Sequence, residues 1–389
     1  MEQFTAKPTA SIPDACDSWS ETFAAYRFLG NSKVEWREIM APHWAQTQSR
    51  MQAYPIVLCI QDTTELDFNG QEMEGLGPLN YEARRGMYLH PTYAVTPDRE
   101  PLGVLDAWMW AREKRTTNEK RSEEKESVRW IEGYERVAEM AATMPTTRLV
   151  YVADREADIV AMMRRARDIN TPADWLVRAK HNRCVPEADG DKLWEHTTTG
   201  SALGEITFTM PGREKQKSRE VRQQLWARSV EISDGSKTGR IAVTCIVARE
   251  VGAAKSIKPI EWRLLTNRQI SCVEEAVELI NWYRARWEIE IYFHVLKNGC
   301  EVEALQLSAI DRLERALALA LFMVVAWRIT YLMRKGRTCP DLDARLFFDP
   351  DEIRGAYLLT KQKMPTEPPT VNEVVRLIAQ IGGFLGRKS

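Results

Sequence analysis

Three short runs of apolar, β-forming residues restrict the possible fold more than any other feature. They are PIVLCI (55–60), LVYVA (149–153) and WLV (175–177), and polar or charged side chains follow each of them. Continuous apolar runs of this length are typical of strands that are buried on both faces, as in a largely parallel sheet. The sequence therefore predicts an α/β fold in which these runs are strands of the central sheet.

Further strand-like runs complete this pattern. YLHPTYAV (88–95) and LGVLDAWMWA (102–111) lie between the first two buried runs. From 182 to 266 apolar and polar residues alternate, as in EITFTM and RIAVTCIVA, which is typical of half-exposed strands. We expect a β-rich module set inside the α/β domain. Its basic stretch 213–222 is interpreted as a solvated hairpin tip, with phosphate contact as the alternative, and the charged stretch 112–130 as a loop and helix start.

The two ends of the chain are predicted to be helical. Capping patterns at Ser32 and Glu35, at Ser271 and Glu274, and at Thr370 and Glu373 predict helix starts, and a helix rich in apolar residues is expected over 311–334. The predicted division is a helical segment (1–54), the first part of the core (55–181), the β-rich insertion (182–266), core helices (267–338) and a helical extension (339–389).

Composition excludes several classes of protein. With 389 residues, 44% apolar and 28% charged, the chain is long and apolar enough for a soluble globular protein of two or three domains. The seven cysteines are scattered and never spaced as C-x-x-C, which argues against a disulfide framework and a structural zinc site and favours a reducing cytoplasm. The longest apolar run has twelve residues, too few for a membrane span, and no secretory signal is visible.

One predicted helix carries an ionisable stripe. Within YRARWEIEIYFHVLK (283–297), a helical repeat places Tyr283, Arg286, Glu290, His294 and Lys297 on one side. Trp287 is interpreted as core because it points away from the centre of the stripe, whereas Arg284 and Glu288 are expected on a solvated face. For His294 a packing or supporting role is favoured over metal ligation.

Three carboxylates could meet near this stripe. Asp62 and Asp154 each follow a predicted buried strand, and ligands of open α/β sheets gather beyond strand ends. With Glu290 they form an oxygen-rich set of the kind that binds Mg²⁺ or Mn²⁺, and two such ions can promote an in-line phosphoryl displacement. Tyr283, Arg286 and Lys297 would then contact phosphates. Taken singly, each aspartate is more often a turn or cap residue, and a helix with mixed charges is more often simply solvated.

The same residues resemble a known family. IQDTT (60–64), VADREADI (152–159) and the spacing Tyr-x2-Arg-x3-Glu-x6-Lys from Tyr283 to Lys297 resemble the bacterial cut-and-paste DDE transposases of the IS-four group, which includes the Tn-five transposase. The similarity runs from about residue 24 to near the C-terminus. It implies a ribonuclease H-like catalytic core with a β-strand insertion between the second aspartate and the glutamate.

The resemblance also implies functional roles. Asp62, Asp154 and Glu290 would hold two Mg²⁺ or Mn²⁺ ions and catalyse nicking, hairpin formation, hairpin opening and strand transfer on DNA. Arg178 and Lys180 match a pair that binds phosphate near the transposon end, and an exposed strand end is the equally favoured alternative. Trp262 matches a tryptophan associated with a flipped base, and a core position is its alternative.

Partners and rival functions follow from the same comparison. The expected partners are double-stranded DNA, as transposon ends and target, and a second copy of the chain in a synaptic homodimer, with no membrane. Only 61 residues precede Asp62, whereas the group usually has a longer helical N-terminus. A shortened regulatory form that binds DNA or active protomers without cutting is therefore one alternative, and another metal-dependent nuclease or phosphatase is the second.

Overall fold

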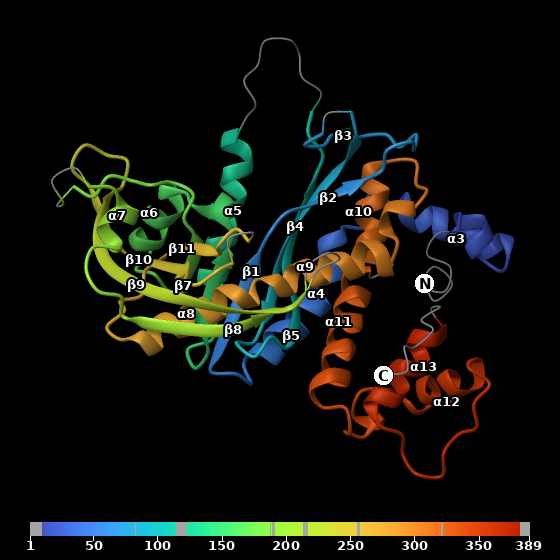
Figure 1. Cartoon of the computed structure of the whole chain (residues 1–389). Coiled ribbons are helices and arrows are strands. Elements are labelled where there is room, and N and C mark those ends of the chain that lie inside the picture. Colours follow the sequence, from blue (N-terminus) through green and yellow to red (C-terminus); the bar gives the residue numbers. More distant parts are fainter. Residues whose placement is uncertain are drawn as a thin grey trace.

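A single mixed sheet of eleven strands organises the described part of the chain, and helices cover both of its faces (Figure 1). The computed structural model describes residues 10–81, 83–113, 123–186, 188, 191–212, 217–254, 257–319 and 322–381. The strand order is β2-β4-β1-β6-β7-β11-β10-β9-β8, and β3 and β5 also pair with β4.

The strands have the following bounds: β1 (Ile56–Gln61), β2 (Thr64–Asp67), β3 (Gly77–Pro78), β4 (Arg85–Val95), β5 (Pro101–Trp110), β6 (Arg148–Ala153), β7 (Asp174–Arg178), β8 (Gly204–Met210), β9 (Arg219–Ser233), β10 (Arg240–Glu250) and β11 (Glu261–Thr266). The three buried runs and the four further runs that the sequence singles out are therefore confirmed as strands. Part of the charged stretches 112–130 and 213–222 lies outside the described residues.

The principal helices are α2 (Ile12–Ala15), α3 (Trp19–Leu29), α4 (Trp36–Met51), α5 (Glu123–Thr143), α6 (Val160–Asp168), α7 (Leu193–Thr197), α8 (Val273–Ala285), α9 (Trp287–His294), α10 (Ile310–Leu319), α11 (Phe322–Thr338), α12 (Pro350–Leu359) and α13 (Val371–Ile381). Short helical turns lie at η1 (Arg155–Ala157), η2 (Val295–Gly299), η3 (Val302–Ala304) and η4 (Ala344–Leu346).

Parallel pairing is confined to the centre of the sheet. β1, β6 and β7 are parallel neighbours, whereas β1 is antiparallel to β4 and β7 is antiparallel to β11. The strands of the predicted insertion, β8 to β11, extend the same sheet beyond β7. The division of the chain into domains stays a prediction.

Side-chain alternation along the central strands produces two cores. Leu58 and Ile60 of β1 face a cluster that includes α8, α9 and α11, whereas Val57 and Cys59 face a cluster that includes α5 and α6. A strand whose successive side chains are all buried needs a layer on each face, which explains the continuous apolar runs. The central sheet is thus the middle of three layers (Figure 1).

Two predicted capping boxes are wrong in detail. α4 begins at Trp36, and its cap residue Glu35 makes no side-chain capping bond, because residues 31–34 form a turn in which the Asn31 side chain accepts from Lys33 N–H. α8 begins at Val273, and Glu275 rather than Glu274 accepts from the backbone N–H of Ser271.

The C-terminal helices form a separate small core on the end of α11. At Thr370 the predicted cap is confirmed, since its hydroxyl accepts from Glu373 N–H at 3.3 Å. A Gly-Gly pair, as at 382–383, is typical of a helix end, and it lies outside the described residues. Within the predicted helical extension, the stretch PDLDARLFFDPDE (340–352) is typical of a linker, yet α12 begins at its end, where Asp349 and Glu352 form a capping box with Pro350 in the first turn.

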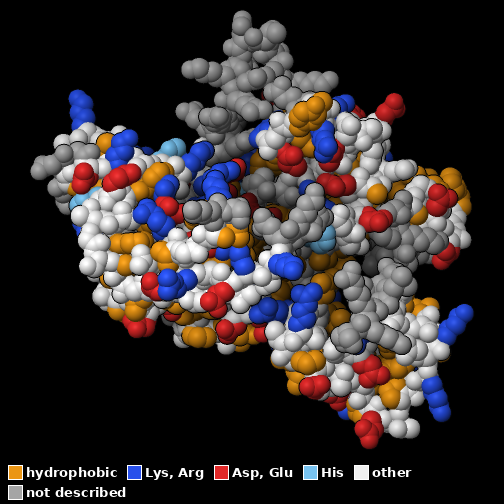
Figure 2. Space-filling model, in the orientation of Figure 1, with side chains coloured by type: hydrophobic (Ala, Val, Ile, Leu, Met, Phe, Trp, Pro, Cys, Tyr) orange, Lys and Arg blue, Asp and Glu red, His pale blue; other side chains and the backbone are white. Residues whose placement is uncertain are grey.

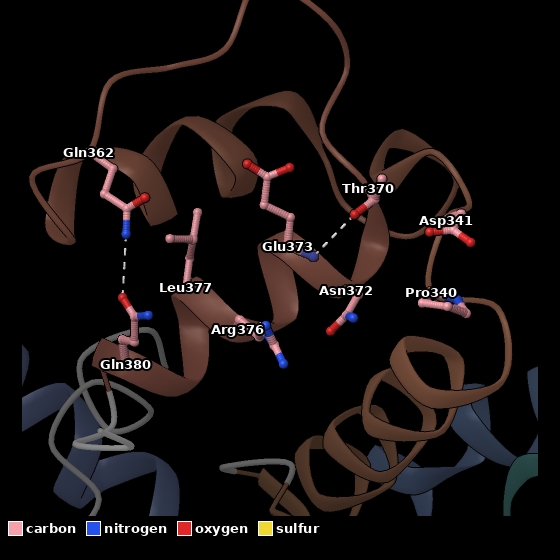
Figure 3. A pocket seen from close by; sticks show the side chains of 9 residues that line it. All are labelled: Pro340, Asp341, Gln362, Thr370, Asn372, Glu373, Arg376, Leu377 and Gln380. Carbon is pink, nitrogen blue, oxygen red and sulfur yellow. Dashed lines mark hydrogen bonds between the residues drawn. The ribbon is translucent and has the colours of Figure 1, made fainter. Parts of the chain in front are cut away.

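A hollow of about 350 Å³ opens between these C-terminal elements (Figure 3). It is lined mainly by polar side chains of α13 and its flanking segments, including Asn372, Glu373, Arg376 and Gln380. No residue predicted from the sequence to act in catalysis or DNA binding lines it.

By length and composition alone, the segment Ile310–Thr338 could cross a membrane, because it contains a long and strongly apolar stretch with few charged residues. Phe322, Met323 and Ala326 of α11 are buried in the larger core, and α11 packs against β5 and α13. These contacts fit the core helix that the sequence predicts.

A glycine in α5 provides a test of this packing. Gly133 faces the buried amide of Gln61, which accepts from the Tyr151 hydroxyl at 2.6 Å and donates to Thr92 at 3.3 Å. A methyl group at Gly133 would displace this amide and break buried hydrogen bonds. We expect Gly133→Ala to lower the free energy of unfolding by about 1–3 kcal/mol in urea titrations.

Gly355→Ala in α12 is the matched control, since the added Cβ would meet no described atom within 4 Å apart from its chain neighbours and the backbone of its own helix. Replacing glycine by alanine inside a helix normally stabilises by about 1 kcal/mol. The two variants should therefore differ in sign, and stabilisation by both would contradict the packing of Gln61 against α5.

Candidate active site

The ends of two parallel strands bring Asp62 and Asp154 together. In the register of β1 and β6, Gln61 lies beside Ala153, so the next residue of each chain emerges at the same edge of the sheet. Neighbouring strands are about 4.8 Å apart, so the two aspartates follow the ends of adjacent strands and lie close to each other. Asp154 also caps η1, because its Oδ1 accepts from Glu156 N–H at 2.7 Å. The turn role considered as the alternative therefore coexists with a place at the site.

The helix α9 supplies the third carboxylate. Arg286, between α8 and α9, forms an ion pair with Asp62, and the same nitrogen lies 3.6 Å from Oε1 of Glu290. The side chains of Arg286 and Asp62 are only 13% and 14% exposed, whereas that of Glu290 is 40% exposed. One guanidinium group thus joins a strand end to a helix more than two hundred residues later in the chain.

Negative charge accumulates at this point. Burial raises the pKa of the Asp62 carboxyl to about 7, against the opposing effect of Arg286, and the charges of Asp154 and Glu290 raise it further. The N–H of Thr63 donates to Asp62 Oδ1 at 2.8 Å and favours the ionised form. The three carboxylates therefore influence one another, and a single arginine leaves the buried Asp62 short of positive charge.

The donor set suits a hard divalent cation, but the side chains are not grouped closely enough to bind one in this arrangement. Carboxylate oxygens are the ligands that Mg²⁺ and Mn²⁺ prefer. Among the residues that the structure describes, however, no three Asp, Glu, His or Cys side chains are grouped closely enough to hold a metal ion. Arg286 contacts both Asp62 and Glu290, so these carboxylates could share an ion only if the guanidinium withdrew.

The rings of Tyr283 and Trp262 contact each other, and Tyr283 also contacts Arg286. The Tyr283 side chain is almost fully buried, interacts with Arg286, and meets the ring of Trp262 edge-on at 6.3 Å. Trp262 is half-buried and stacks on Phe208 with ring centroids 5.5 Å apart. The packed ring expected of a core tryptophan is therefore present at Trp262, and its role in base stacking stays a prediction.

The expected stripe ends before Lys297. After His294 the chain makes a wide turn in which Cys300 N–H donates to Val295 O at 2.9 Å, a five-residue repeat that changes the direction of later side chains. Lys297 pairs with Glu303 at 3.4 Å. His294 is exposed and bonds to Asn298, so it does not contribute to the carboxylate group.

A loop held by Asp158 presents the two remaining predicted phosphate ligands. Arg178 ends β7, and Lys180 is exposed two residues later. The fully buried Asp158 accepts from the backbone N–H groups of Lys180 and His181 at 2.6 and 2.9 Å, and pairs with Arg183 at 2.6 Å. Asp158 belongs to the VADREADI motif, but no local pattern in the sequence predicts its contact with the loop after β7.

The predicted orientation of α9 is wrong for two residues. Trp287, interpreted as core, is 47% exposed, and Glu288, expected in solvent, is only 9% exposed. The buried face of α9 is formed by Ile289, Tyr292 and Phe293, which pack in the core cluster that contains β1.

Glu288 lies at the edge of this face, and the positive charges of nearby arginines partly offset the cost of burying its carboxylate. Burial raises the pKa of its carboxyl, against the opposing charges of Arg334, Arg99 and Arg337. Arg284, also expected on a solvated face, instead lies over the ring of Phe208 at 4.0 Å. The number of apolar side chains on each side of α9 does not decide which side faces the sheet.

Positively charged side chains lie close to this region. Figure 2 shows Lys and Arg groups near the middle of the visible face, over α9 and α11, with Asp and Glu among them. Such a mixture agrees with a net charge of −1 for the whole chain and with basic surface that is only local.

Three family models match the chain. The transposase DDE domain matches residues 137–326, the transposase DNA-binding family matches 1–34, and the transposase Tn5 dimerisation domain matches 324–389. The DDE match contains Asp154 and Glu290, whereas Asp62 precedes it. Together with the mixed sheet, it confirms the predicted ribonuclease H-like fold class.

One solved structure with detectable similarity is the cryo-EM structure of a piggyBac transposase synaptic complex with hairpin DNA. The identity is 8% and the TM-score 0.38, and the alignment covers 96% of this chain. The chain spans 66% of the length of that structure's chain. A TM-score this low supports no argument about the site.

The pKa of Asp62 leads to a testable pH dependence. Because it is raised from 3.8 to about 7, the folded protein holds this proton more tightly than the unfolded chain, and stability falls as pH rises between these values. Between about pH 5 and pH 8 the wild type should lose up to about 3 kcal/mol relative to Asp62→Asn in urea unfolding of the metal-free protein.

Asp234→Asn is the matched control. Hydrogen bonds from Ser236 and Arg167 lower the pKa of Asp234 to about 2, so its carboxylate stays ionised throughout that window. Its effect on unfolding should be the same at both pH values. A difference between wild type and Asp62→Asn that is equally constant would contradict the burial of an ionisable Asp62.

Proposed function

We propose that this chain, which belongs to the DDE transposases and is similar to the Tn5 transposase, cuts and joins DNA by metal-dependent phosphoryl transfer. The proposed sequence is cut-and-paste: nicking at the element's end, hairpin formation, hairpin opening and strand transfer into target DNA. All four steps exchange one phosphodiester oxygen for another, so a single site can serve them.

The observation that supports this proposal most directly is the meeting of strand ends and helix. Asp62 and Asp154 leave adjacent parallel strands at one edge, and Glu290 is joined to Asp62 through Arg286. Acidic side chains are rarely gathered in a partly buried place without a cation to offset them. Asp62, Asp154 and Glu290 would hold two Mg²⁺ or Mn²⁺ ions.

When bound, two divalent ions would activate the attacking oxygen and stabilise the leaving oxygen of an in-line displacement. The protein's own groups position the DNA. Arg286, once released from Asp62 and Glu290, is placed to bind a phosphate beside the carboxylates. Tyr283 would orient Arg286 from behind, and Lys297, now paired with Glu303, would bind a phosphate further along.

The remaining contacts would hold the end of the element. Arg178 ends β7 and Lys180 lies on the loop that Asp158 anchors, and both are proposed to bind phosphates there. Trp262 is proposed to support an unstacked base. Trp287 adds an exposed aromatic surface next to Arg286, which lies 5.7 Å from its ring. Stacking of a base on an aromatic ring contributes about 1–3 kcal/mol.

Binding and pairing would involve the two ends of the chain. Residues 1–34 match a DNA-binding family and are proposed to contact DNA, and residues 324–389 match a dimerisation family and are proposed to join two protomers in a synaptic complex. A cytoplasmic location follows from action on bacterial DNA and remains part of this proposal.

Substitution of the carboxylates tests the reaction. Asp62→Asn, Asp154→Asn and Glu290→Gln remove ligand charge while keeping side-chain size. With Mn²⁺ or Mg²⁺ and DNA carrying the element's ends, the wild type should nick and form hairpins, and each variant should lose at least about 100-fold in rate while still binding DNA in gel-shift assays.

Other outcomes separate the rival functions. A wild type that binds the ends but never cuts them would support a regulatory, inhibitory protein. Hydrolysis of small phosphomonoesters without action on DNA would support a phosphatase. Asp158→Asn is not a suitable control, because Asp158 holds the loop that carries Lys180. Glu156→Gln is the matched control, because Glu156 lies two residues after Asp154 and is outside the proposed set of ligands.

Salt dependence tests the phosphate contact of Arg286. Each lost phosphate contact reduces counterion release, so Arg286→Ala should lower the slope of log Kd against log salt by about 1. Arg165→Ala is the matched control, since Arg165 pairs with Glu135 on the helices that cover the other face of the sheet. Equal slopes for wild type and Arg286→Ala would refute the contact.

A further inference from the structure

The strand that carries Asp62 is interrupted at this residue. β1 and β2 both pair with the same edge of β4, with Gln61 beside Thr92 and Thr64 beside Leu89. The two registers are continuous, so Asp62 lies opposite Pro91 and Thr63 opposite His90. Without the interruption, β1 and β2 would be one strand.

A proline explains why the ladder opens here. Pro91 has no N–H to donate, and prolines are normally confined to sheet edges or irregularities. In this protein β4 is paired on both sides, since Pro91 lies beside Ala107 of β5 on its other edge. The missing donor falls opposite Asp62, which is therefore free of regular pairing and can turn its carboxylate toward the site.

A side-chain contact spans the interruption. Oγ1 of Thr63 lies 2.6 Å from Nδ1 of His90, and the N–H of Thr63 donates to Oδ1 of Asp62 at 2.8 Å. These two hydrogen bonds connect the Asp62 carboxylate to β4, the strand that faces it. A shift of the Thr63 backbone would move the N–H group that donates to the Asp62 carboxylate.

His90 is fixed from the other side. It is 1% exposed and lies edge-on to the rings of Trp130, Trp108 and Trp110 at 4.6, 5.8 and 6.1 Å. Its Nε2 has no hydrogen-bond partner among the described residues, and burial, followed by the charge of Arg129, lowers its pKa to about 3. An apolar side chain would leave no unpaired nitrogen, so packing alone gives no reason for histidine here.

We propose that His90 is a positioning residue of the phosphoryl-transfer site, which acts through Thr63 to fix the strand interruption from which Asp62 reaches the metal ions. This inference rests on the proposed function. Groups that orient metal ligands typically change metal affinity or activity by about 10- to 100-fold when they are removed.

Metal binding by the full chain without DNA tests the inference. Thr63→Val keeps the volume of Thr63 but removes its hydroxyl, and His90→Leu removes the ring nitrogen. Both should weaken Mn²⁺ binding, measured by electron paramagnetic resonance titration, by about 10- to 100-fold. Thr63→Ser keeps the hydroxyl and should restore affinity to the wild-type value.

A double-mutant cycle separates positioning from stability. If the two side chains act as one unit, the Thr63→Val and His90→Leu double variant should bind Mn²⁺ no more weakly than the poorer single variant. His43→Leu is the control for loss of a buried histidine, since His43 accepts from Val104 N–H at 3.1 Å and its burial lowers its pKa to about 4. It should lower thermal stability and leave Mn²⁺ affinity unchanged.

Several results would overturn the inference. Wild-type Mn²⁺ affinity in Thr63→Val would do so even if His90→Leu failed to fold, and so would additive losses in the double variant. Failure of Thr63→Ser to restore affinity would also do so. A wild type that binds Mn²⁺ but does not cut DNA would instead contradict the proposed function, and the cycle could still be measured.

Discussion

The in-register parallel pairing of β1 with β6 is the interaction on which the rest of the site depends. Its backbone hydrogen bonds place Gln61 beside Ala153, and the next residue on each strand is an aspartate. Side chains alternate between two cores along both strands, so a shift by one residue would turn Leu58 and Ile60 toward the wrong layer. The packing that stabilises the sheet therefore also fixes where two carboxylates emerge.

Electrostatics then governs what this place can do. Bringing Asp62, Asp154 and Glu290 together in a partly buried place is unfavourable, and Arg286 offsets only part of the charge. The same guanidinium can serve the carboxylates or a DNA phosphate, but not both at full strength. Metal ions and DNA would accordingly favour each other's binding. A DNA phosphate that binds Arg286 would free Asp62 and Glu290 for metal ions, and metal ions on these carboxylates would free Arg286 for the phosphate.

The sequence predicts the central strands well because both of their faces are buried, and short apolar runs rich in β-branched residues favour a strand over a helix. It also predicts that Asp62 and Asp154 follow strands and that Glu290 lies on a helix, since these are local properties, and the catalytic role of the three carboxylates stays a prediction. It fails for Trp287 and Glu288, because α9 has two apolar sides and only the tertiary packing of Ile289, Tyr292 and Phe293 selects one. The pairing of Lys297 with Glu303 and the link from His90 to Thr63 depend on a wide turn and on strand register, which no local pattern contains.

Strands β8 to β11 are continuous with the central sheet, and this limits how the chain can change in evolution. β11 pairs with β7 and is followed within seven residues by α8, the first half of the helix that leads to Glu290. These strands are not a separate appendage, because the last of them, β11, sets the starting point of that helix. We expect sequence changes to be restricted in β11, which pairs with β7, and better tolerated at β8, the outermost strand on this side of the sheet.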